Sequence, residues 1–250
     1  VEDAGRRLLE HGPPYLTRDA IAALPEAERL IGYTPYQPGM ALFGLPRAAF
    51  ADAWWTDARV WFAAATALAL LVAADRLTGR LRAIQAATVL PICALTLATG
   101  GDDLPVLALC LLALALSTGQ HNLAAGLAAG AAGALKLFAW PVIAVLLIHA
   151  LTRGRSVALR FATGAIGLPV LAMIPVALVD FSAFVENVVR FPLGQGLVDS
   201  PAQSPFPGHL LATAVPGGRV AAAALLVAAA AVVAVVLLRR PPRTATAAAY

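Results

Sequence analysis

The chain has 250 residues, of which 60% are hydrophobic and 13% are charged, and its formal net charge is +4. Soluble globular domains are roughly 45–50% apolar and about 25% charged, so this composition excludes an ordinary soluble domain. The long apolar runs predict an all-α protein, a polytopic transmembrane helical bundle with short broken or re-entrant helices and an extracytoplasmic loop.

Arginine is concentrated directly beside the apolar runs. There are three clusters: Arg76, Arg80 and Arg82; Arg153, Arg155 and Arg160; and Arg239, Arg240 and Arg243. Cytoplasmic loops of membrane proteins carry such an excess of positive charge. The distribution therefore predicts a multi-pass membrane protein with these clusters inside, and it argues against a nucleic-acid partner.

Three regions are expected in chain order. Residues 1–37 form an extracytoplasmic loop with short amphipathic helices, one of which is capped by Thr17. Residues 38–238 form the transmembrane helical domain, including an outer loop over residues 180–218. Residues 239–250 form a cytoplasmic tail.

Within the transmembrane domain, Pro38–Phe50 is either a re-entrant segment or a thin span, because it is apolar but short. The other expected spans are Val60–Ala74, Ala83–Thr99, Leu104–Leu116, Val157–Val179 and Arg219–Leu238. Cys93 and Cys110 lie inside such runs and are expected to pack there. Gly126 and Gly130 form a GxxxG motif, whose simplest explanation is close helix packing.

The stretch Asn122–Leu151 is almost continuously apolar and carries a single charge, Lys136, near its middle. A charged ammonium at the bilayer centre costs roughly 2.5–3.5 kcal/mol on insertion scales, and a hairpin avoids that cost. We therefore predict two short helices, Leu123–Leu135 and Leu137–Leu151, with Lys136 at the tip. Each arm is about 20 Å long, shorter than the hydrocarbon core of roughly 30 Å, so the tip is expected to border a cavity.

Lys136 and an acidic pair are the main candidates for binding chemistry. Lys136 could contact a lipid-linked phosphate, or it could simply extend to the lipid headgroups. Asp102 and Asp103 could position a sugar hydroxyl or phosphate or bind a divalent cation; alternatively, one of them caps the helix that begins at Leu104. Apart from that cation, no cofactor or metal is expected, because the histidines and cysteines lack metal-site spacing.

The outer loop over residues 180–218 begins with an amphipathic pattern. Apolar residues recur at helical spacing from Phe181 to Val189, while Glu186 and Arg190 lie four residues apart on the opposite face. This pattern predicts an interfacial helix that turns Glu186 and Arg190 towards water. A proline-rich stretch follows and is expected to form a lid.

Four further residues are weaker candidates. Arg190 and His209 could bind a phosphate and a sugar, although a solvated loop position is the simpler explanation for each. Glu2 and Asp3 could supply a general base, although any charged terminal segment contains such residues.

Four short motifs occur in a definite order along the chain. They are Leu8-Leu9-x-x-Gly12-x-x-Tyr15, Tyr33-x-Pro35 with Leu45-Pro46, Thr99-Gly100-Gly101-Asp102-Asp103-Leu104-Pro105-Val106-Leu107, and the small-residue stretch from Ala125-Gly126 to Leu135-Lys136. Their order resembles the GT-C superfamily of integral-membrane glycosyltransferases, and in particular actinobacterial mannosyltransferase-like proteins that use polyprenyl-phosphate sugars.

The resemblance implies an enzyme of a bacterial cytoplasmic membrane that transfers a sugar from a lipid phosphate, without a nucleotide-sugar site. It also implies that an acidic residue on the first outer loop acts as general base. Asp3 is the matching acid here. It lies closer to Gly12 than the family's acid does, so an acid upstream of Val1 is the alternative base.

The leading hypothesis is a glycosyltransferase that moves a hexose, such as mannose, from polyprenyl phosphate to a cell-envelope glycan or glycolipid. Its partners would be membrane lipid, the lipid-linked donor and the acceptor. The first rival is a transporter or lipid flippase whose charged residues line a translocation path, although no internal repeat supports it. The second rival is a non-catalytic membrane protein.

Overall fold

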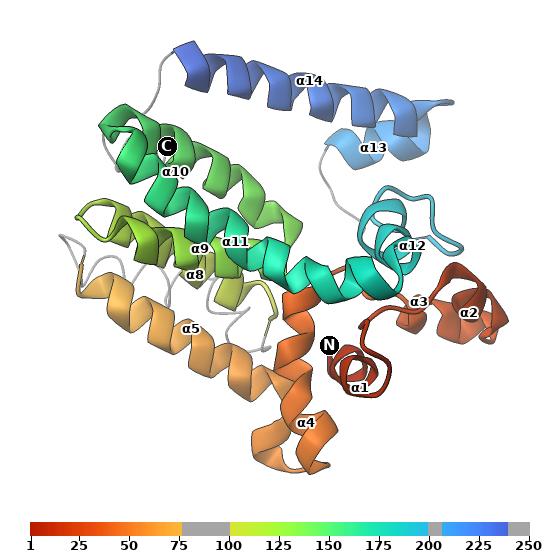
Figure 1. Ribbon diagram of the computed structural model, residues 1–250. Coiled ribbons are helices and arrows are strands. Elements are labelled where there is room, and N and C mark those ends of the chain that lie inside the picture. Colours follow the sequence, from red (N-terminus) through yellow and green to blue (C-terminus); the bar gives the residue numbers. More distant parts are fainter. Residues whose placement is uncertain (77–100, 200–206, 240–250) are drawn as a thin grey trace.

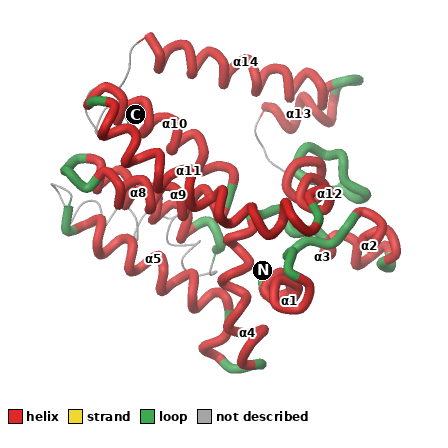
Figure 2. Tube along the Cα trace, in the orientation of Figure 1, coloured by secondary structure: helices red, strands yellow, loops and turns green. Residues whose placement is uncertain are grey.

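The computed structural model describes residues 1–76, 101–199 and 207–239, and within these ranges it contains helices and no strand (Figures 1 and 2). The all-α prediction is therefore confirmed for the described residues. The expected span Ala83–Thr99 lies outside them, as do Cys93 and most of the proline-rich stretch.

Short helices form the N-terminal part of the chain. They are α1 (Glu2–His11), α2 (Arg18–Ala23), η1 (Glu26–Glu28), α3 (Arg29–Gly32), η2 (Pro38–Gly44), α4 (Leu45–Phe50) and η3 (Trp54–Thr56). Thr17 caps α2 as expected, because its side-chain oxygen accepts a hydrogen bond from the Ala20 amide at 3.1 Å. The segment predicted as re-entrant or thinly spanning is broken into the 3₁₀-helix η2 and the short α4, each too short to cross a bilayer.

Longer helices form the bundle. They are α5 (Ala58–Ala74), α8 (Leu104–Ser117), α9 (Asn122–Leu135), α10 (Trp140–Arg153) and α11 (Arg155–Val179), with η4 (Leu137–Ala139) between α9 and α10. The chain continues through α12 (Phe181–Phe184), the π-helix η5 (Val185–Arg190), α13 (Pro207–Ala214) and α14 (Gly218–Arg239).

Among the described residues, one helix is long and apolar enough to cross a membrane by length and composition, the 25-residue α11 with a mean hydropathy of 2.1. Only 22% of its apolar window is buried, whereas the core helix of a soluble protein would be mostly buried. Shorter apolar stretches lie in α5, α8, α9, α10 and α14. One spanning helix is thus supported, and the polytopic bundle stays a prediction.

Glycines allow α9 to pack directly against α11. A Cβ atom on Gly126 would lie 2.0 Å from the Phe161 carbonyl oxygen, and one on Gly130 would lie 2.2 Å from the Gly164 carbonyl oxygen. A methyl group has no space at either position, so the two backbones touch. The packing interpretation of the GxxxG motif is confirmed, and α9 lies at the centre of the bundle between α8 and α11 (Figure 1).

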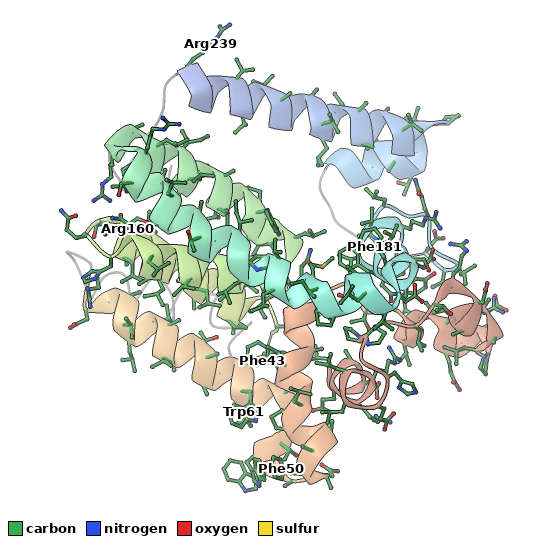
Figure 3. All side chains as sticks on the ribbon, viewed as in Figure 1. Phe43, Phe50, Trp61, Arg160, Phe181 and Arg239 are labelled. Carbon is green, nitrogen blue, oxygen red and sulfur yellow. The ribbon has the colours of Figure 1, made fainter. Side chains whose placement is uncertain are left out.

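Arginines lie at the end of the bundle where α10 ends and α11 begins. At this end the Arg153 guanidinium donates hydrogen bonds to the carbonyls of Ser117 and Gly119, both at 2.9 Å, and so joins the α8–α9 turn to the end of α10. In Figure 3, Arg160 and Arg239 lie to the left of Phe181, which begins α12. The arginine-bearing ends are therefore separated from the outer loop, as the sequence predicts.

Candidate functional site at the tip of the α9–α10 hairpin

The chain leaves α9 at a lysine, as the hairpin prediction requires. Lys136 has extended backbone angles (φ −147°, ψ 147°), and η4 and α10 follow it directly. Pro141 lies at the start of α10, where the missing N–H breaks no helical hydrogen bond. The predicted hairpin with Lys136 at its tip is confirmed.

Lys136 binds both members of the acidic pair. Its Nζ lies 3.0 Å from Asp102 Oδ1 and 2.5 Å from Asp103 Oδ1. The Lys136 side chain is 13% exposed, Asp102 24% and Asp103 52%. We call these three residues the charged cluster. Because the ammonium is directed to two carboxylates, the alternative in which it extends to lipid headgroups does not describe this geometry.

The alternative role of the acidic pair, capping of α8, is wrong. Asp103 occupies the N-cap position, but its side chain makes no hydrogen bond to the helix. Pro105, in the first turn of α8, has no N–H that a cap could bind. The Lys136 ammonium offers Asp103 a charge-assisted partner instead, and such bonds are stronger than neutral ones.

Tyr36 is a member of the site that the sequence analysis missed. Lys136 Nζ lies 4.8 Å from the centre of its ring, and the Tyr36 hydroxyl interacts electrostatically with Asp102. Burial raises the pKa of Tyr36 above its ordinary value, and the neighbouring Asp102 carboxylate raises it further. The only sequence signal was its place beside the Tyr33-x-Pro35 motif, just before an apolar segment.

Asp3, the candidate general base, lies in the first turn of α1. Asp3 itself pairs with Arg6 on the same helix and is half exposed. Neighbouring Glu2 has a structural role, because its Oε1 accepts a hydrogen bond from the first amide of α5 at 3.1 Å. The general-base role of Asp3 stays a prediction.

The remaining predicted site residues lie on other elements. Arg190 Nη1 is 3.6 Å from Glu186, and the Arg190 side chain is more than half exposed. His209 belongs to α13, which packs against α14. The structure records no bond from Arg190 to the charged cluster, and the substrate-binding roles of Arg190 and His209 stay predictions.

The predicted orientation of Glu186 in the outer-loop helix is wrong. Glu186 was expected to face water but is 2% exposed, whereas Phe184 and Val188 are buried and Arg190 is more than half exposed, as the pattern predicts. Part of this stretch is a π-helix rather than an α-helix, and its wider turn rotates the following residues. Arg18 and Tyr33 supply Glu186 with the partners that a buried carboxylate needs.

Hydrogen bonds hold Glu186 in its charged form. One Arg18 nitrogen donates to both carboxylate oxygens, at 2.8 and 2.9 Å, and the Tyr33 hydroxyl donates at 2.9 Å. Burial acts to raise the pKa of Glu186, but the hydrogen bonds from Arg18 and Tyr33 outweigh it, and this pKa lies below its ordinary value.

The described residues contain no group of three or more histidine, cysteine, aspartate or glutamate side chains that could hold a metal ion. At the charged cluster the two carboxylates share the ammonium of Lys136, which occupies the place a cation would take. A divalent cation at Asp102 and Asp103 stays a prediction.

Comparison with protein families identifies the chain. The family described as glycosyltransferase family 87 matches residues 33–250, a range that contains Tyr36, the charged cluster and the whole helical bundle. No curated protein and no solved structure matches the chain. The match confirms the resemblance seen in the motifs, and the chain belongs to glycosyltransferase family 87, a family of GT-C-type membrane glycosyltransferases.

Proposed function

We propose that this glycosyltransferase moves a hexose, with mannose as the first candidate, from polyprenyl phosphate to a cell-envelope glycan or glycolipid. The reaction takes place at the outer face of a bacterial cytoplasmic membrane. The observation that carries the proposal is the charged cluster, a lysine and two aspartates held together at the tip of a hairpin of two short apolar helices.

Lys136 is the residue that binds the donor phosphate. The cluster as it stands contains one cation and two carboxylates, so an incoming phosphate must replace one carboxylate at the ammonium. Asp103 is the one that leaves, because its side chain is 52% exposed, whereas that of Asp102 is 24% exposed. Asp103 then faces the entering acceptor.

The transfer itself balances without a cofactor. The acceptor oxygen forms a bond to the anomeric carbon of the hexose while the bond from that carbon to the phosphate oxygen breaks. The acceptor proton passes to a carboxylate on the outer loop, with Asp3 or an acid upstream of Val1 as the base. The departing polyprenyl phosphate keeps its contact with Lys136, which stabilises the charge that develops on it.

An apolar groove beside the cluster fits a lipid-linked donor. It has a volume of about 360 Å³ and lies between α8 and α10, two helices that both begin near the charged cluster. Its lining includes Cys110, Leu114 and Val142, and it contains no charged side chain. A phosphate at Lys136 would therefore have an apolar path for its hydrocarbon chain.

The orientation in the membrane follows from charge. The arginines Arg153, Arg155 and Arg160 lie at the end of the bundle away from the hairpin tip, and cytoplasmic loops favour such residues. The charged cluster and the outer loop then lie on the extracytoplasmic side. The multi-pass arrangement, with α5, α8, α9, α10 and α14 crossing or entering the bilayer beside α11, belongs to the same proposal.

Transfer of radiolabelled hexose in membranes containing the full-length protein tests this function. Lys136→Met is expected to abolish transfer from polyprenyl-phosphate sugar while the protein remains folded and inserted. Lys136→Arg is expected to keep part of the rate, because it preserves charge but changes the geometry of the donor contact. If Lys136→Met transfers hexose at the wild-type rate, Lys136 does not bind the donor phosphate.

The same preparation separates the enzyme from its first rival. A wild-type protein that transfers no polyprenyl-linked sugar, but moves a solute or lipid across proteoliposomes, would be a transporter. The charged cluster would then line a translocation path.

A further inference from the structure

The outer-loop helix and the charged cluster are joined by five residues, Tyr33–Gln37, which we call the connecting segment. Its first two residues bind η5, and its last two bind the cluster and the end of α9. The segment lies between two parts of the chain that are distant in sequence, and its side chains and backbone are largely buried at both ends.

The first end of the connecting segment is held by two buried side chains of η5. The Tyr33 hydroxyl donates to Glu186 at 2.9 Å and accepts from the Leu197 amide at 2.8 Å. The Thr34 amide donates to Asn187 Oδ1 at 2.8 Å. Asn187 is fully buried and Glu186 is 2% exposed, so water cannot replace these bonds.

The second end of the connecting segment is held by the bundle. The Gln37 amide donates to the Leu135 carbonyl at 3.0 Å, one residue before Lys136. The Tyr36 carbonyl accepts a hydrogen bond from the Tyr15 hydroxyl at 2.7 Å, while the Tyr36 ring lies 4.8 Å from Lys136 Nζ. Pro35, between the two ends, has a fixed φ angle and limits how the segment can bend.

We infer that Glu186 and Asn187 are positioning residues, which hold Tyr36 against Asp102 and Lys136 through the connecting segment. The segment is short and restrained at both ends, so a displacement of η5 must move Tyr36. Small displacements of this kind are costly in an active site, where about 1 Å can reduce the rate about 100-fold. The inference extends the proposed function and depends on it only for its activity test.

Hydrogen exchange of the full chain in nanodiscs tests the coupling without any transfer assay. Tyr33→Phe removes the hydroxyl but keeps the ring that stacks on Phe191, with centroids 4.1 Å apart. We expect the Gln37 amide to exchange about ten-fold faster in this variant and in Glu186→Gln. Faster exchange confined to η5 and Thr34, with Gln37 unchanged in both variants, would overturn the inference.

A matched control lies in the same loop. The Ser182 hydroxyl bonds Asp180 at 2.7 Å within the loop, and no hydrogen bond joins it to the connecting segment. Ser182→Ala should therefore leave both Gln37 exchange and the transfer rate unchanged. If it accelerates Gln37 exchange as much as Tyr33→Phe does, the effect is general loosening of the loop and the inference fails.

The activity test asks whether Tyr33 acts through Tyr36. Tyr36→Leu removes the ring that lies 4.8 Å from the Lys136 ammonium, and we expect it to lower kcat about ten-fold. Tyr33→Phe should lower kcat by a similar factor, and the double variant should be no slower than Tyr36→Leu alone. If the reductions in kcat of the two single variants multiply in the double variant, the inference is contradicted. If the wild-type protein transfers no sugar, the proposed function is refuted, and the hydrogen-exchange result alone decides whether the positioning role of Glu186 and Asn187 is correct.

Discussion

Lys136 Nζ lies 3.0 Å from Asp102 Oδ1, although 34 residues separate them in the chain. Both residues are largely buried, so removing either leaves the other without its partner in a place where water cannot fully replace it. The effects of substituting the two residues on the free energy of unfolding should therefore not be additive. We expect Asp102→Asn and Lys136→Met to show a coupling of about 1–3 kcal/mol in a double-mutant cycle on thermal stability in detergent. Strictly additive effects would mean that the two residues are apart.

The α9–α11 contact makes a prediction about stability. Gly126→Ala should destabilise the protein by about 1–3 kcal/mol, because the new methyl group would meet the Phe161 carbonyl oxygen. Gly167, on α11, is the control, because a Cβ there has nothing within 4 Å. Gly167→Ala should be neutral or stabilise by up to about 1 kcal/mol. Equal melting temperatures for the two variants would contradict the close backbone contact.

Acid should release the outer loop through Glu186. The pKa of Glu186 is lower in the folded protein than its unfolded value of about 4.3, so its contribution is complete above that value and is lost as the pH falls through the folded value. Arg18, Tyr33 and Arg190 are the groups that face it. Limited proteolysis of the loop should thus be constant from pH 7 to about pH 5 and accelerate as the pH falls further.

Glu186→Gln supplies the control for this pH dependence. Glutamine cannot ionise, so the rate of loop proteolysis in that variant should not increase at acidic pH. Retention of the full increase would assign it to another group.

Topology can be read from single cysteines placed in a background without Cys93 and Cys110. A membrane-impermeant thiol reagent should label position 195, in the outer loop, in intact cells. Position 155, beside the arginine cluster, should react only after permeabilisation. Labelling of position 155 but not 195 in intact cells would reverse the orientation and place the charged cluster inside.

Chelation tests the cation at the acidic pair. The Lys136 ammonium already lies between Asp102 and Asp103, so wild-type transfer should not change in excess EDTA. Lys136→Met leaves two adjacent carboxylates without a counter-charge, and added Mg²⁺ should then raise its thermal stability. Loss of wild-type activity in EDTA, restored by Mg²⁺, would show that the pair holds a divalent cation.

The hairpin and the α9–α11 packing could be predicted because their causes are local in sequence. A lone lysine in an apolar run can avoid the free-energy cost of a charge in the membrane at few positions, and the tip of a hairpin is one of them. Glycines four residues apart lie on one helix face and allow close packing. The sequence predicts that Lys136 and Asp102 reach one extracytoplasmic cavity and couple there. The actual ion pairs depend on how α8 and α9 pack.

The role of Tyr36 at the site and the burial of Glu186 were not predicted, because the residues that they contact are distant in the sequence. Glu186 binds Arg18 across 168 residues, and no periodicity reports such a contact. The same network explains why the burial of Glu186 was not predicted. An amphipathic pattern gives burial only for a regular α-helix, and the π-turn at Val185–Arg190 changes the register.

The backbone contact between α9 and α11 has a consequence for biosynthesis. In the proposed multi-pass arrangement, α9 reaches the membrane before Gly164 has been made, so one of the helices that it packs against does not yet exist. Its 14 residues are also short for independent insertion. Completion of α11 is therefore the event that covers the glycine-lined face of α9.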